Sequence, residues 1–258
     1  MDSKAQNTNI STSRAQEQNK LDLGAERSRS IREMFGRIAP TYDRLNRTLS
    51  ASIDQRWRKK AISYIEPKED LKVLDLCAGT LDLTLAILKK FPHAQVTALD
   101  FSDKMLELGE KKIPADKKSQ VKIVVGDAMD LKFPADSFDA VICGFGMRNV
   151  VDNGICLNEI HRILVPLGRV ITLEFFRPET LRGKLFHSTF GKWVMPRVGS
   201  ILSKDPEAYD YLFNSIQSYY SVEEFVNLLV NKNFHLLARK NLTSHIASIV
   251  VGQKTMGE

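Results

Sequence analysis

The sequence predicts a doubly wound α/β fold, in which a mostly parallel sheet is covered by helices on both faces. Short apolar runs that lack regular alternation are typical of strands buried on both sides, and here they alternate with stretches of helical spacing. Near the C-terminus, two further apolar runs are separated by a short loop, which predicts an antiparallel hairpin. The chain of 258 residues is long enough for one large domain of this class.

We expect a tail, a single domain and one helical insert. Residues 1–27 contain too few apolar side chains to offset the entropy lost on ordering, so they are expected to be disordered. The domain then covers residues 28–258, beginning with helices over 28–66. Residues 177–220 have a helical pattern broken by prolines, so we expect several short helices there that form a lid over the substrate.

Capping patterns place the first helices. Ser30 with Glu33 is a capping box that begins a helix, and Pro40 is expected to end it. A second helix is expected to begin near Ser52, with Gln55 as its capping partner three residues later. Each helix carries apolar side chains at helical spacing, so one face of each is expected to be buried.

Seven strands are expected in all. The first five alternate with helices, which implies right-handed βαβ units and parallel pairing. The seven are expected at Lys72–Cys77, Gln95–Asp100, Val121–Val125, Phe138–Gly144, Arg169–Phe176, Phe234–Lys240 and Ile246–Gly252, the last two forming the hairpin. Five parallel strands finished by an antiparallel hairpin are the layout of the class I, Rossmann-like methyltransferases.

Later helices carry clear end signals. Ser102 is expected to cap the helix after the second strand. A helix over Asn153–Leu164 is expected to end before Pro166 and Gly168. Ser221 with Glu224 forms another capping box.

Composition argues against several classes of protein. The net charge of +6 is moderate and no dense run of Lys and Arg is present, so no nucleic-acid partner is expected, while attraction to an anionic membrane stays open. No apolar run reaches the roughly 20 residues that cross a bilayer, and the polar first residues resemble neither a secretory signal nor a transit peptide. Cys77, Cys143 and Cys156 form no Cys-x-x-Cys pair, so free thiols in a cytoplasmic protein are expected.

A strand, a tight turn and a helix meet in the segment Val73–Asp82 (VLDLCAGTLD). In open α/β sheets, ligands bind at the carboxyl ends of the strands, and small residues in the turn let the backbone approach them closely. Asp100 follows Gly79 by 21 residues and ends the second strand. A carboxylate at that position is placed to accept hydrogen bonds from two ribose hydroxyls.

The loop favours S-adenosylmethionine over a dinucleotide as the cofactor. A pyrophosphate cradle requires G-x-G-x-x-G and a free helix N-terminus, whereas this loop has only Gly79, and Asp82 brings a negative charge to the start of the helix. That charge would repel a pyrophosphate. It suits the methionine ammonium of S-adenosylmethionine, directly or through water.

Two further positions are expected to face this cofactor. Asp127, followed by Ala128, comes after the third strand and is placed to meet the adenine amino group; equally, Asp127 caps the next turn. Gly144 ends the fourth strand and would lie beside the sulfonium, where a small residue leaves room for the acceptor. The alternative at Gly144 is simple backbone freedom.

Six blocks of sequence form a combined signature. They are Phe35–Asp43, Val73–Asp82, Phe138–Val150, Leu173–Phe175, Tyr209–Ile216 and Asn241–Thr243. Together they resemble the ubiquinone/menaquinone biosynthesis C-methyltransferases over about residues 30–252, most specifically in Arg148-Asn149 and in the Tyr-x-Tyr-Leu segment. The resemblance implies methyl transfer from S-adenosylmethionine to a ring carbon of a polyprenylated quinol: demethylmenaquinol, a ubiquinol precursor, or both.

The resemblance also implies cofactor contacts and a homodimer. The contacts fall on Thr80, Asp100, Asp127 with Ala128, and Gly144. The chain departs from the family pattern at Leu81, where glycine is usual. The side chain of Leu81 must therefore point away from the methionine moiety or weaken cofactor binding.

Carbon methylation requires a nucleophilic ring carbon, which a quinol supplies when a hydroxyl loses its proton. A phenol with a pKa of about 10 is mostly protonated at neutral pH, so the site should stabilise the anion and accept the proton. Arg148 follows the fourth strand, where the acceptor should lie, and we expect it to supply a fixed positive charge. Asn149 is expected to orient the oxygen or a water. Tyr42, from the N-terminal helices, is expected to close over the ring. We expect Arg148 with an ordered water to carry the proton transfer; the alternative is a structural pair with an acid such as Asp43.

Other residues are expected to have structural roles. The five histidines lack metal-ligand spacing, so no metal is expected, and only His187 merits a functional test. Residues 181–202 interleave apolar and basic side chains. A helix packed on the sheet explains most of them; the functional alternative is an apolar lid that touches the inner face of the membrane.

Three other functions remain open at this level. The first is a methyltransferase for another small molecule, with an oxygen or nitrogen nucleophile. The second is a protein that binds S-adenosylmethionine but has lost turnover, for which Leu81 is the best support. The third is an RNA methyltransferase, although the chain lacks an appended basic module.

Overall fold

The computed structural model describes residues 26–44, 46–48, 50, 52–179, 206–243 and 245–256. Almost all of the expected tail therefore lies outside the described residues, as do residues 180–205 of the expected lid and His187 within it. Residues 26 and 27, which the sequence assigned to the tail, are already helical.

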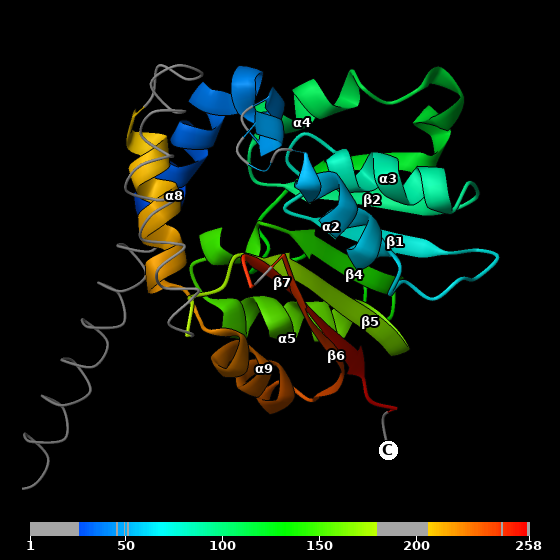
Figure 1. The fold of residues 1–258 in the computed structure, drawn as a ribbon. Helices are drawn as coiled ribbons and strands as arrows, with labels where there is room; N and C mark the ends of the chain where they lie inside the picture. The colour runs from blue at the N-terminus through cyan, green and yellow to red at the C-terminus, as the bar shows by residue number, and fades with distance from the viewer. Residues whose placement is uncertain are drawn as a thin grey trace, which may run out of the picture.

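The core of the molecule is a seven-stranded sheet with the order β3-β2-β1-β4-β5-β7-β6 (Figure 1). Strands β1 to β5 pair in parallel, and β7 is antiparallel to both of its neighbours, β5 and β6. The strands are β1 Lys72–Leu76, β2 Gln95–Asp100, β3 Val121–Val125, β4 Phe138–Gly144, β5 Leu164–Glu174, β6 Phe234–Leu242 and β7 Ala247–Lys254. The expected fold class, with seven strands and a C-terminal antiparallel hairpin, is confirmed.

Helices cover both faces of this sheet (Figure 1). On one face, α5 and α9 pack against alternate strand residues such as Leu74 and Val141. On the other face, α2 and α3 pack against the intervening residues, such as Val73 and Ile142. The described helices are α2 Ile53–Ile62, α3 Asp82–Lys90, α4 Asp103–Glu110, α5 Asn153–Ile163, α8 Pro206–Ser218 and α9 Val222–Asn231, with 3₁₀ turns η1 Ala115–Gln120 and η2 Met147–Asn149.

The N-terminal helix is longer than the capping pattern predicted. Residues 26–44 are helical, so Ser30 does not begin the helix and Pro40 does not end it. Proline inside a helix removes one backbone hydrogen bond and crowds the carbonyl four residues earlier, and burial of an apolar face offsets that cost. The buried face consists of Ile31, Met34, Phe35, Ile38 and Ala39, packed with Met105 of α4.

Strand β5 also begins earlier than expected. It starts at Leu164, directly after α5, and includes Pro166 and Gly168, which were expected to separate helix from strand. Its pairing with β4 shifts register near this start, and Leu167 adopts a left-handed φ of 64°. A proline is tolerated there because the hydrogen-bond ladder is interrupted.

Of the expected caps, one forms in full. The Ser221 side chain accepts the backbone N–H of Glu224, and the Glu224 carboxylate accepts the N–H of Ser221, which completes the capping box of α9. Ser52 and Ser102 precede α2 and α4 as expected, but neither side chain makes a capping hydrogen bond. These serines mark the helix starts without the predicted bonds.

Candidate cofactor and acceptor site

The loop between β1 and α3 is a sharp turn at the carboxyl end of β1. Cys77, Gly79 and Leu81 all have left-handed backbone angles, with φ of 56°, 54° and 66°. The backbone N–H of Gly79 donates to Oδ2 of Asp100 at 2.8 Å, which ties the loop to the end of β2. Strand order reverses between β1 and β4, so the loop lies at the switch point where α/β sheets bind ligands.

Leu81 points away from the ligand side of this loop. Its side chain is fully buried and packs with Ala98, Leu106 and Ile113. A Cβ added at Gly109 of α4 would lie only 2.4 Å from Cγ of Leu81, so the glycine makes the space that the leucine fills. The requirement that Leu81 turn away from the methionine moiety is therefore met by packing against α4.

We expect Gly109→Ala to destabilise the protein, because the new methyl group would also approach the carbonyl carbon of Thr80 at 2.8 Å. Overpacking of this kind costs about 1–3 kcal/mol, measurable as a lower free energy of unfolding in urea. Combined with Leu81→Gly, the total loss should be smaller than the sum of the two single losses, because the closest clash is gone. Fully additive losses in the double variant would contradict the proposed fit between Leu81 and Gly109.

A cavity of about 400 Å³ lies at the carboxyl ends of β1, β2, β3 and β4. Seven of the residues named from the sequence line it: Tyr42, Gly79, Asp100, Asp127, Ala128, Gly144 and Asn149. Phe35 and Tyr42 of the N-terminal helix form one wall. Thr80, Asp82 and Arg148 do not line this cavity.

Asp100 is the best-defined polar group of the cavity. Oδ2 accepts the Gly79 N–H and Oδ1 accepts the Ser102 N–H, both at 2.8 Å. Burial raises the pKa of Asp100 to about 6, with the backbone hydrogen bonds opposing the rise, so the carboxylate is mostly ionised at pH 7. Each carboxylate oxygen has a second lone pair, which leaves Asp100 able to accept from two ribose hydroxyls.

Asp127 caps a turn and also lines the cavity. Its Oδ1 accepts the backbone N–H of Met129 at 2.8 Å, so it caps the turn after β3. It also lines the cavity, beside Ala128 and the apolar side chains of Leu99 and Val125. Apolar walls around one carboxylate fit a flat adenine ring with an exocyclic amine.

Packing around Gly144 is tight. A Cβ at this position would lie 2.6 Å from Cδ1 of Leu83, so alanine would force the Leu83 side chain to move. Gly144 lines the cavity, as do Gly79 and Phe145. Three features of the cavity together fit S-adenosylmethionine. They are the carboxylate of Asp100, which suits a ribose, the apolar side chains beside Asp127, which suit an adenine, and the space beside Gly144.

Arg148 is buried in an ion pair with an acid, as the structural alternative anticipated, but the acid is not the one suggested. Nη1 of Arg148 donates to Oε1 of Glu174 and to the carbonyl of Phe145, each at 2.6 Å. Its acidic partner is therefore Glu174, and the suggested pairing with Asp43 is wrong. Glu174 ends β5, 26 residues from Arg148. It lies in the signature block Leu173–Phe175, but nothing in the sequence paired it with Arg148.

Electrostatics around Arg148 favour its charged form. Burial lowers the pKa of Arg148, but Glu174, Tyr42 and Tyr211 together outweigh it and the net pKa is raised. The guanidinium lies over the ring of Phe175, 5.7 Å from its centroid. Arg148 lines a neighbouring cavity of about 450 Å³ with Ser215 and Tyr219, and Val150 and Val151 line both cavities.

Two tyrosines lie near Arg148. The Tyr211 hydroxyl donates to Oδ1 of Asn149 at 2.8 Å, a contact that the sequence did not predict although Tyr211 belongs to a signature block. Burial raises the pKa of Tyr42, and the charge of Arg148 opposes the rise. Tyr42, Arg148, Asn149 and Tyr211 thus gather where the two cavities adjoin.

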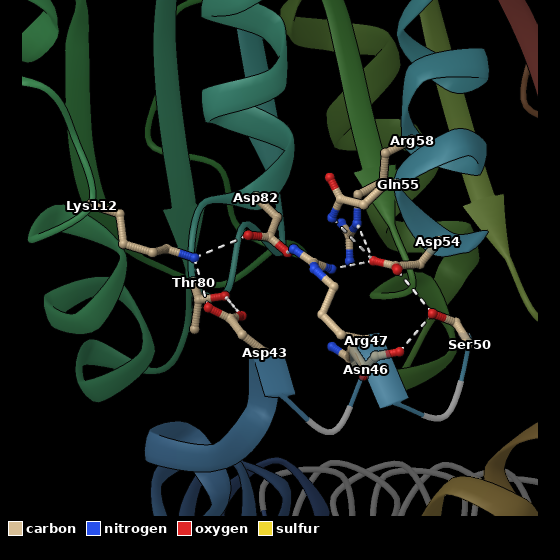
Figure 2. Close-up of polar contacts among 10 residues, drawn as sticks. All are labelled: Asp43, Asn46, Arg47, Ser50, Asp54, Gln55, Arg58, Thr80, Asp82 and Lys112. Atoms are coloured by element: carbon tan, nitrogen blue, oxygen red, sulfur yellow. Dashed lines mark hydrogen bonds and ion pairs between the residues drawn. The ribbon is translucent and has the colours of Figure 1, made fainter. Parts of the chain in front are cut away.

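Thr80 and Asp82 are bonded to Asp43 and Arg47, which belong to the N-terminal segment, residues 26–50 (Figure 2). The Thr80 hydroxyl donates to Asp43. Asp82 accepts from Nη2 of Arg47 at 2.7 Å and from Nζ of Lys112 at 3.0 Å. The N-terminal segment therefore bonds directly to two residues expected to contact the cofactor.

Among the described residues, no group of three His, Cys, Asp or Glu side chains could hold a metal ion. The three cysteines are free thiols. None of the helices in the described part of the chain is both long enough and apolar enough to span a membrane.

This sheet order, with a glycine loop and the carboxylate of Asp100 at the switch point, defines a class I, S-adenosylmethionine-dependent methyltransferase. The chain belongs to the ubiE/COQ5 methyltransferase family, which it matches over residues 22–254. Its cofactor is S-adenosylmethionine.

Relatives and solved structures agree with this class. The chain is 38% identical to a ubiquinone/menaquinone biosynthesis C-methyltransferase of Geotalea daltonii, over 89% of this chain and 98% of the relative. It is 36% identical to a demethylmenaquinone methyltransferase of Thermotoga maritima, with the same coverage of both chains. Phosphoethanolamine N-methyltransferase 2 of Haemonchus contortus, solved with S-adenosylmethionine, shares the fold at 15% identity, with a TM-score of 0.60 over 78% of this chain and 53% of that one.

Proposed function

We propose that the chain methylates a ring carbon of a polyprenylated quinol in menaquinone or ubiquinone biosynthesis, for example by converting demethylmenaquinol to menaquinol. The names of the relatives from Geotalea and Thermotoga support this reaction. The observation that carries the proposal is the meeting of two cavities at Val150 and Val151. One cavity fits the cofactor, and the other brings Arg148 beside it.

The cofactor supplies an activated methyl group. The residues of the chain have to orient the quinol and favour its anion. We assign stabilisation of the phenolate to Arg148, whose fixed positive charge is already held in place by Glu174. Asn149, anchored by Tyr211, orients the phenolate oxygen or a water that accepts the hydroxyl proton. Loss of that proton raises electron density at the ring carbon, and loss of the ring hydrogen after carbon–carbon bond formation restores aromaticity.

Tyr42 closes the site from the N-terminal helix. Its ring packs edge-on to Phe35, with centroids 5.9 Å apart. Both residues line the cofactor cavity. An aromatic wall of this kind excludes water and covers a planar acceptor ring.

We also propose a peripheral membrane contact and a homodimer. A polyprenylated substrate resides in the bilayer, and exposed Arg27 and Arg29 lie on the helix whose Phe35 and Tyr42 line the cofactor cavity. Residues 181–202, for which a lid that touches the membrane was the functional alternative to a helix packed on the sheet, lie outside the described residues. Co-sedimentation with anionic liposomes and light scattering of the purified protein test these two proposals; absence of binding, or a monomeric mass, would remove each.

Purified protein with S-adenosylmethionine and chemically reduced demethylnaphthoquinol should give a product with one added methyl group on carbon, detected by mass spectrometry. The oxidised quinone is the matched control. It should give no product, because it lacks the phenolate that makes the ring carbon nucleophilic. A methyl group on oxygen, or no product from any quinol while cofactor binding persists, would contradict the proposed function.

A further inference from the structure

A chain of ion pairs joins residues 43–58 to Asp82, which follows the glycine loop (Figure 2). Arg47 connects Asp54 of α2 to Asp82 of α3, and Lys112 connects Asp82 to Asp43. The network is completed by Arg58, which pairs with Asp54. Three carboxylates thus face three cations, so their formal charges balance.

Asp82 is the centre of this network. Its side chain is only 13% exposed, and each of its oxygens accepts from a different cation, Oδ2 from Arg47 and Oδ1 from Lys112. Burial acts to raise the pKa of Asp82, but Arg58, Lys112 and Arg47 outweigh it and hold the pKa below its ordinary value. Asp82 is therefore an anion at neutral pH, with two nearby cations that are each about one-third exposed.

The network lies where the amino-acid end of the cofactor should extend. Asp127, Ala128 and Asp100 all line the cavity, and we expect the first two to receive the adenine and Asp100 the ribose. Asp100 also accepts the N–H of Gly79, so a ligand that continues from the ribose along the loop reaches Thr80 and Asp82. The methionine end carries an ammonium and a carboxylate only a few bonds apart, so it requires an anion and a cation side by side.

We propose that Arg47 and Lys112 form the subsite for the methionine carboxylate of the cofactor, while Asp82 receives the ammonium. The ammonium takes the place of one cation on Asp82, and the displaced cation pairs with the incoming carboxylate. This exchange keeps every charge paired, because the methionine end is a zwitterion. Arg47 presents a planar fork of donors that matches a carboxylate, and Lys112 adds a point charge.

Calorimetry with two ligands tests the subsite without any quinol. S-adenosylhomocysteine has the amino-acid end, and 5′-methylthioadenosine lacks it. Arg47→Gln and Lys112→Gln should each weaken S-adenosylhomocysteine by about tenfold or more, and leave the affinity for 5′-methylthioadenosine unchanged. Retained binding of 5′-methylthioadenosine shows at the same time that each variant is folded.

The matched controls are Arg44→Gln and Lys111→Gln, which remove exposed charges close to Arg47 and Lys112 in the chain. Neither should change either affinity. Parallel weakening of both ligands in Arg47→Gln and Lys112→Gln would reduce these residues to supports of the loop and overturn the proposal. Unchanged or stronger binding of S-adenosylhomocysteine would also overturn it, because Arg47 would then be absent from the site or would block Asp82. None of these outcomes depends on the identity of the methyl acceptor.

Discussion

Replacing Arg148 with alanine is expected to lower kcat for quinol methylation by about a hundredfold or more, since this is the usual cost of removing one preorganised group that stabilises a developing anion. The affinity for S-adenosylhomocysteine should stay unchanged, because Arg148 does not line the cofactor cavity. Steady-state kinetics with the reduced quinol and calorimetry with S-adenosylhomocysteine measure the two quantities.

The variant needs a control for folding, because Arg148 is buried against Glu174 at 2.6 Å. Arg148→Met combined with Glu174→Gln removes the charge and roughly preserves the volume of both side chains. This pair should remain folded and bind S-adenosylhomocysteine, yet be as inactive as Arg148→Ala. Normal turnover in either protein would remove Arg148 from the mechanism.

Glu174→Ala is expected to lower the free energy of unfolding by about 3 kcal/mol, because it leaves Arg148 as a buried cation without its carboxylate. Glu174 also accepts the backbone N–H groups of Arg148 at 3.3 Å and Phe175 at 2.7 Å, and both would lose their partner. Urea unfolding followed by circular dichroism gives the difference. Turnover should fall as well, since Glu174 positions Arg148.

The matched control for stability is Glu66→Ala. Glu66 pairs with Arg169, but its side chain is 65% exposed, and exposed pairs contribute about 1 kcal/mol or less. If Glu174→Ala and Glu66→Ala lower the free energy of unfolding equally, burial would not explain how much the Arg148–Glu174 pair stabilises the protein.

Strands β1, β4 and β7 were predictable because they are buried along most of their length and therefore form apolar runs in the sequence. The edge strands β3 and β6 are only partly buried. Element ends predicted from single prolines and glycines were less reliable. Pro40 looked like a helix end, yet the apolar face from Ile31 to Ala39 packs well enough to carry the helix past it. Pro166 and Gly168 looked like a connection, but tertiary pairing with β4 draws them into an irregular strand.

Within the site, the cofactor residues follow from the fold and the spacing of a single motif. Gly79 lies in the loop that follows β1, and Asp100 ends the adjacent parallel strand β2, so their meeting is a consequence of sheet order. Pairs formed between distant elements carry no such signal. Arg148 meets Glu174, Asp43 meets Thr80, and Tyr211 meets Asn149 across separations of 26, 37 and 62 residues, and only the packed structure brings them together.

One wall of the cofactor cavity belongs to the N-terminal helix, which contributes Phe35 and Tyr42 from outside the sheet. Asp43, one residue beyond Tyr42, is bonded to Thr80 and Lys112. This wall is therefore bonded to the loop beneath it. If the spent cofactor leaves past this wall, we expect these contacts to break before it is released, so that their opening rate limits how many cycles the enzyme completes per second.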